Sequence, residues 1–91
     1  MSELSTTTVP RIGRGFRFQW EPAQECHVLL YPEGMVKLNG SAGEIMTRCD
    51  GERSIEAIVG ELESAFNATG LAPEVLSFVE IAGRQRWLAW E

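Results

Sequence analysis

The spacing of apolar and polar residues changes from a period of two to a period near 3.6 about halfway along the chain. Phe16, Phe18 and Trp20 alternate with polar residues, which predicts a half-buried strand. A dense apolar run predicts a second strand at Cys26–Tyr31, and Met35–Leu38 alternates again as a return strand. We therefore expect the first half to form a small antiparallel meander.

Apolar residues of the second half recur at helical spacing. A short helix is expected over 42–49, a second one begins after Ser54 as its N-cap, and a third begins at Pro73. The segment 87–90 is expected to be a last strand or an extended tail that packs back. The apolar positions of the second and third helices are Ile55, Ile58, Val59, Leu62 and Phe66, then Val75, Leu76, Phe78, Val79, Ile81 and Ala82.

Turn and cap residues separate these elements. Pro32 presets φ at the start of a turn, and Gly34 is expected to take a positive φ that closes a three-residue hairpin. Ser41 and Glu44 have the spacing of a capping box, so Ser41 is the predicted N-cap of the first helix. Gly51 is expected to adopt the left-handed conformation just after that helix.

Three strands followed by three helices give an α+β fold. We predict an N-terminal three-stranded antiparallel sheet followed by a three-helix bundle, in an arrangement like a winged helix-turn-helix. Ninety-one residues make one domain. Residues 1–10 are polar and aperiodic, so they are interpreted as a flexible N-terminal tail, and 11–91 as the domain.

Charge and composition exclude several functions. Acidic residues outnumber basic ones 13 to 8, for a net charge of −5, which opposes general nucleic-acid binding. No stretch has the length of a membrane span, and residues 1–10 do not resemble a secretory signal, so a cytoplasmic location is expected. Five basic residues near the chain ends are either solvated flanks or a docking patch for an acidic partner: Arg11, Arg14, Arg17, Arg84 and Arg86.

No catalytic or metal-binding constellation is visible. Cys26 and Cys49 belong to different predicted elements, and His27 is the only histidine, so a zinc site lacks ligands. The two cysteines are interpreted as small buried hydrophobes. Neither a catalytic triad nor a phosphate-binding loop is recognisable, so we predict no enzyme activity and no cofactor.

Two features suggest a binding groove. The strand Met35–Leu38 is expected at a sheet edge, where an extended peptide could add as a further strand. In the third helix, Val75, Phe78, Val79 and Ala82 form one stripe. That stripe either packs in a small core or lines a groove beside the edge strand. The alternative interpretation of Lys37 on the edge is protection against aggregation of the free protein.

The blocks YPEGMV-x-LN at 31–39 and CDG at 49–51 together resemble the PqqD family of pyrroloquinoline quinone (PQQ) biosynthesis, the prototype of precursor-peptide recognition elements. The resemblance spans about 11–88 and includes Trp20 and Trp87. It implies a peptide chaperone that binds the ribosomal precursor peptide PqqA and presents it to the radical SAM enzyme PqqE. The contacts it implies fall on Met35, Val36, Lys37 and Leu38 of the strand and on Val75, Phe78, Val79 and Ala82 of the helix.

Two other functions are weighed against this one. A winged-helix DNA-binding protein shares the fold class. A purely structural subunit, or an accessory domain fused to an enzyme, needs no peptide. Strand addition predicts that Val36→Pro abolishes peptide binding. For assembly, we expect a monomer or a strand-exchanged homodimer, since 21–25 could act as a tether between protomers.

Overall fold

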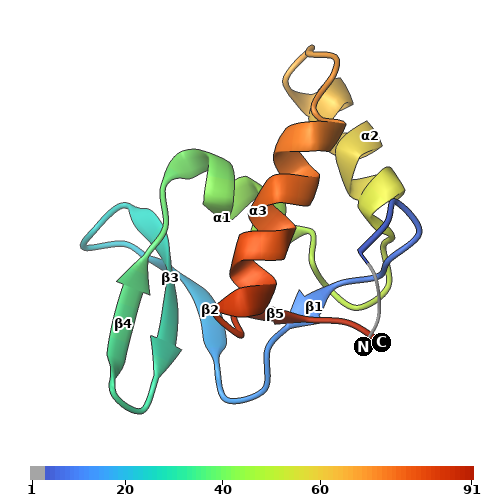
Figure 1. Ribbon diagram of the computed structural model, residues 1–91. Helices are drawn as coiled ribbons and strands as arrows, with labels where there is room; N and C mark the ends of the chain where they lie inside the picture. The colour runs from blue at the N-terminus through green and yellow to red at the C-terminus, as the bar shows by residue number, and fades with distance from the viewer. Residues whose placement is uncertain (1–3) are drawn as a thin grey trace.

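The structure is a computed structural model that describes residues 4–91. The strands β2 (Arg17–Glu21), β3 (Cys26–Tyr31) and β4 (Gly34–Lys37) form an antiparallel sheet in the order β2-β3-β4 (Figure 1). Three helices follow in the chain, namely α1 (Gly40–Thr47), α2 (Ile55–Ala65) and α3 (Ala72–Arg84). The α+β fold predicted from the sequence is confirmed.

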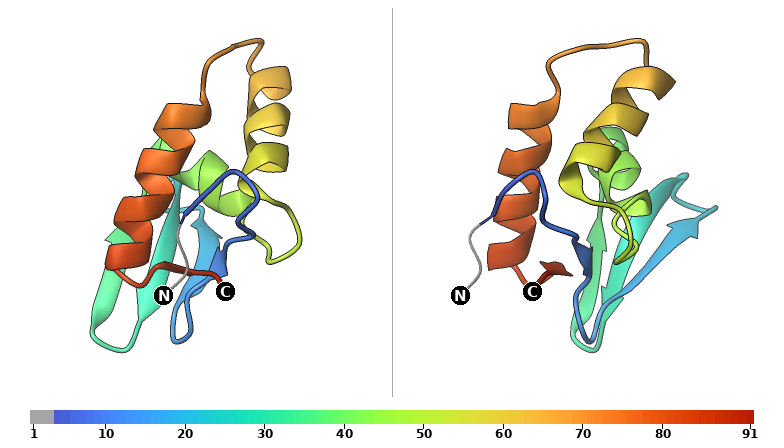
Figure 2. Two further views of the ribbon diagram at one scale, coloured as in Figure 1. Left: turned by 45° about the vertical axis from the view of Figure 1, so that its right-hand side comes forward. Right: turned by 90° about the vertical axis from the view of Figure 1, so that its right-hand side faces the viewer.

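A second, two-stranded sheet joins the two ends of the described chain. Here β1 (Arg11–Ile12) pairs antiparallel with β5 (Leu88–Ala89), and the Gly13 N–H donates to the Trp87 carbonyl at 2.7 Å. The first and last strands of the described chain therefore lie side by side (Figure 2). A last strand near 87–90 was one of the two expectations for that segment. The strand β1 was not predicted, because a strand of two residues is too short to show an alternating pattern.

The segment 4–10 is part of the folded domain, which differs from the predicted tail. The Thr8 carbonyl accepts a 2.8 Å hydrogen bond from the first N–H group of α2, that of Ile55. The Thr6 carbonyl accepts a 2.8 Å hydrogen bond from the second, that of Glu56. These N–H groups have no partner inside their own helix, so the segment completes the start of α2. Pro10 is fully buried. Residues 1–3 lie outside the described part of the chain.

The core lies between the inner face of the main sheet and the three helices. α1 packs on β3, α2 packs on both α1 and α3, and α3 also contacts β5. Gly43 of α1 is buried against the His27 ring of β3, which itself stacks on Phe18 at 4.9 Å. The buried apolar core consists of Leu29, Leu38, Ala42, Ile45, Met46, Cys49, Ile55, Ile58, Val59, Leu62, Val75, Val79, Ala82 and Leu88.

The N-cap of α1 differs from the prediction. Asn39, not Ser41, caps the helix, because the Asn39 Oδ1 accepts a 2.8 Å hydrogen bond from the Ala42 N–H. Sequence spacing could not decide between two capping residues so close together. The Ser54 cap of α2 is confirmed, since its Oγ accepts from the Ala57 N–H at 3.2 Å.

The β3–β4 hairpin is also tighter than predicted. Tyr31 pairs directly with Gly34, which leaves a two-residue loop of Pro32 and Glu33, and Gly34 does not have a positive φ. The three-residue loop expected from the sequence is therefore wrong. Gly51 does have a positive φ, +80°, although α1 already ends at Thr47.

Candidate functional site

The edge of the main sheet at β4 carries backbone groups that no other strand pairs within residues 4–91. The Leu38 N–H donates to the His27 carbonyl at 3.0 Å, and Leu29 faces Val36 in the register. Antiparallel pairing alternates along a strand, so the amide and carbonyl of Val36 also point towards β3. Those of Met35 and Lys37 therefore point away from the sheet, towards solvent.

The side chains of β4 divide between its two faces. Leu38 is buried in the core and Val36 is half-buried beside it, whereas Met35 is 42% exposed and Lys37 is exposed. The strand predicted as the peptide-binding edge is thus an edge strand. It has one apolar side chain on the outer face, at Met35, next to one cation, at Lys37.

On α3, the structure separates residues that the sequence grouped together. Val75, Val79 and Ala82 are at most 1% exposed and belong to the core, so they offer almost no surface to a ligand. Phe78 alone of the predicted stripe is half-buried, and Ile81, outside that stripe, is 48% exposed. The periodicity had located the core face of the helix, which was one of the two open interpretations.

The flank of α3 next to that core face carries Glu74, Phe78 and Ile81. Their spacing of four and three residues puts them one above the other on the helix. Glu74 lines a hollow that α3 shares with the first turn of α1, the helix that follows β4. Glu80 and Gly83 line a different, shallow hollow on the other flank. Phe78 and Ile81 therefore lie on the side of α3 that is turned towards α1 and β4.

The fold brings together three of the five basic residues near the chain ends. Arg14, Arg84 and Arg86 line the shallow hollow, together with Trp90. Contact between the β1–β2 turn and the α3–β5 turn produces this grouping, through the Gly13 hydrogen bond described above. Arg84 also lies 3.6 Å from Glu80, and both side chains are exposed.

Cys49 and His27 are both packed against other side chains. Burial, together with the neighbouring Asp50 carboxylate, raises the pKa of Cys49 to about 12, so its thiol stays protonated and weakly nucleophilic at neutral pH. His27 is enclosed by the rings of Phe18 and Trp20. Within residues 4–91, no three His, Cys, Asp or Glu side chains gather closely enough to hold a metal ion. The helices of that part of the chain all fall short of what crossing a bilayer requires.

A three-stranded sheet with an unpaired edge strand at β4, followed by three helices, has a counterpart among solved structures. The solution structure of the PqqD part of Methylobacterium extorquens PqqCD matches this fold with a TM-score of 0.79. The two chains are 26% identical, and the match covers 96% of this chain and 95% of the other. That protein is described as a functional, stand-alone recognition element for ribosomally synthesised and post-translationally modified peptides.

Sequence comparison identifies the family. Residues 26–88 match the family described as Coenzyme PQQ synthesis protein D (PqqD). A relative from Azotobacter vinelandii named "PqqA binding protein" is 55% identical, over 97% of each chain. Another of that name, from Klebsiella pneumoniae, is 44% identical over 93% of this chain and 94% of its own. The chain belongs to the PqqD family.

Proposed function

We propose that this protein is a cytoplasmic peptide chaperone of PQQ biosynthesis. It binds the precursor peptide PqqA as an added strand on β4 and presents it to the radical SAM enzyme PqqE. The name "PqqA binding protein" of its relatives supports the choice of peptide. The outward-facing amide and carbonyl groups of Met35 and Lys37 are the observation that supports the mode of binding.

Backbone pairing alone does not account for useful affinity. Two outward-facing residues offer two N–H and two C=O groups, and each hydrogen bond contributes about 0.5–1.5 kcal/mol net. Their sum is about 4 kcal/mol, whereas micromolar binding needs about 8 kcal/mol. The remainder has to come from apolar burial at about 25 cal/mol per Å², less the cost of ordering the peptide.

The side chains available for that burial are Met35 and Val36 on β4 and Phe78 and Ile81 on α3. Each keeps apolar surface exposed, and Phe78 and Ile81 lie on the flank of α3 that is turned towards the start of α1, the helix that follows β4. We therefore assign the helix contacts of the site to Phe78 and Ile81, in place of the buried part of the predicted stripe. The protein acts by holding the peptide, and it performs no bond chemistry itself.

Amide chemical shifts recorded during a titration with PqqA test the assignment. Shifts are expected at Met35, Lys37, Phe78 and Ile81, because the peptide changes their hydrogen bonding or ring-current environment. Shifts confined to β2 or to the hollow near Arg86 would contradict it. For the second half of the proposal, cross-linking of PqqA by PqqE is expected to require this protein.

A further inference from the structure

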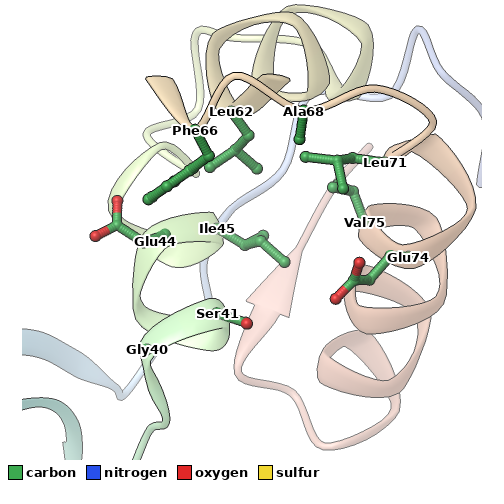
Figure 3. Close-up of a pocket in the computed structure, with 10 residues that line it drawn as sticks. All are labelled: Gly40, Ser41, Glu44, Ile45, Leu62, Phe66, Ala68, Leu71, Glu74 and Val75. Atoms are coloured by element: carbon green, nitrogen blue, oxygen red, sulfur yellow. The ribbon is translucent and has the colours of Figure 1, made fainter. Parts of the chain in front are cut away.

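A hollow of about 360 Å³ lies between the start of α1, the end of α2 and the start of α3 (Figure 3). It lies outside the main sheet, and none of its walls belongs to β4. Its volume is at the lower end of the range for sites that bind small ligands. The lining residues are Gly40, Ser41, Glu44, Ile45, Leu62, Phe66, Ala68, Leu71, Glu74 and Val75.

The interior of the hollow is apolar. Ile45, Leu62 and Val75 are nearly fully buried, while Phe66 at the rim is 55% exposed. Leaving a phenylalanine ring half in water forgoes hydrophobic stabilisation that an apolar occupant would restore. The size and lining suit one or two bulky apolar side chains.

The rim of the hollow is acidic. Glu44 and Glu74 come from opposite walls, α1 and α3 (Figure 3). Arg48 lies 3.0 Å from Glu44, whereas none of the ion pairs formed within residues 4–91 includes Glu74. A cation next to the apolar occupant would have a carboxylate to meet at Glu74, and an acidic neighbour would be repelled.

The two elements of the proposed peptide site, β4 and the Phe78 flank of α3, both extend to this hollow. β4 continues through Leu38 and Asn39 into Gly40, only three residues beyond Lys37. On α3, the flank that carries Phe78 continues by one turn to Glu74 at the rim. A strand paired with β4 advances about 3.3 Å per residue, so its next few residues reach the hollow.

We propose that the hollow holds a bulky apolar side chain of PqqA, next to a Lys or Arg, just beyond the segment that pairs with β4. The inference rests on the proposed function, because the occupant belongs to the same peptide. It gives the site a second anchor, on the helices. This anchor supplies affinity that the short edge of β4 lacks.

Filling the hollow tests the proposal. Ala68 points into it (Figure 3), so Ala68→Phe occupies the space that the peptide side chain needs. Ala57 is exposed on α2 and does not line the hollow, so Ala57→Phe is the matched control. Ser41→Trp places a large side chain at the rim from an exposed position. It is the second test variant if Ala68→Phe has a lowered melting temperature. Titration calorimetry with full-length PqqA measures the affinity of each variant.

Ala68→Phe and Ser41→Trp are expected to weaken binding by about tenfold to a hundredfold, the effect of losing one buried apolar side chain. Ala57→Phe should bind like the wild type. A PqqA peptide in which the side chain that occupies the hollow is replaced by Ala should bind the wild type more weakly by the same factor. Ala68→Phe should bind this substituted peptide only slightly more weakly than it binds unsubstituted PqqA. Glu74→Lys should also weaken binding, by less at high salt.

The inference is overturned if the wild type binds PqqA and folded Ala68→Phe and Ser41→Trp bind it equally well. A wild type that does not bind PqqA would instead refute the proposed function. The two failures are therefore distinguishable.

Discussion

Replacing Lys37 by proline tests strand addition with least disturbance of the fold. The Lys37 amide points away from β3, so no hydrogen bond of the sheet depends on it. Proline is tolerated in edge strands where the N–H faces solvent. The substitution therefore removes a donor from the proposed interface while the hairpin remains intact.

The size of the effect follows from the hydrogen bond that is lost. The bond itself contributes about 0.5–1.5 kcal/mol, and the peptide carbonyl left without a donor costs about 1–3 kcal/mol. Because the edge is partly open to water, we expect a loss of about 2–3 kcal/mol. Lys37→Pro should therefore bind PqqA about 30- to 150-fold more weakly than the wild type.

Calorimetric titration with PqqA and a thermal melt of each variant provide the measurement. Lys37→Ala removes the same side chain but keeps the amide, so it is the matched control. Trp20→Pro probes the other edge of the sheet, because by the same alternation the Trp20 amide faces away from β3. It is expected to leave binding within a few-fold of the wild type.

Equal affinity of Lys37→Pro and Lys37→Ala, with normal melting of both, would refute strand addition on β4. If Trp20→Pro lost PqqA binding and Lys37→Pro did not, the peptide would have to add to β2 instead of β4. Val36→Pro, the substitution that the sequence first indicates, is a poor test. Its amide is used by the sheet, so loss of binding there would report unfolding.

Three further predictions concern the fold. A Cβ at Gly43 would lie 2.7 Å from His27 Nδ1, so Gly43→Ala should lower the free energy of unfolding by about 1–3 kcal/mol. Gly60→Ala, in open space on α2, should raise it by about 0.5–1 kcal/mol, and urea titration compares the two. Asn39→Ala should lower the free energy of unfolding by about 1 kcal/mol, and Ser41→Ala should lower it much less. Equal losses of stability in the two variants would contradict the assignment of Asn39 as the N-cap. The folded-state pKa of Cys49 is raised from 9.0 to about 12, so its contribution to stability is fully present below pH 9. That contribution is lost as the pH rises from about 9 to about 12, which melting of wild type and Cys49→Ala would reveal.

Local patterns predicted most of the secondary structure. The alternation at Phe16–Trp20, the apolar run at Cys26–Tyr31 and the helical stripe after Ser54 each identified an element within one or two residues of its observed bounds. They did so because side-chain periodicity and capping act over a few residues and are written directly in the chain. The edge position of β4 also followed, since a three-stranded meander must end in its last strand.

Long-range contacts decided what local patterns could not. The β1–β5 sheet and the attachment of 4–10 to α2 join segments more than 40 residues apart, and no short window contains both partners. Periodicity marked the apolar face of α3 but not what would cover it. Only packing against α2 and β5 assigned Val79 and Ala82 to the core and left Ile81 exposed. The hollow at Phe66 depends on three helices meeting, because a concave surface belongs to an arrangement of elements and to no single one of them.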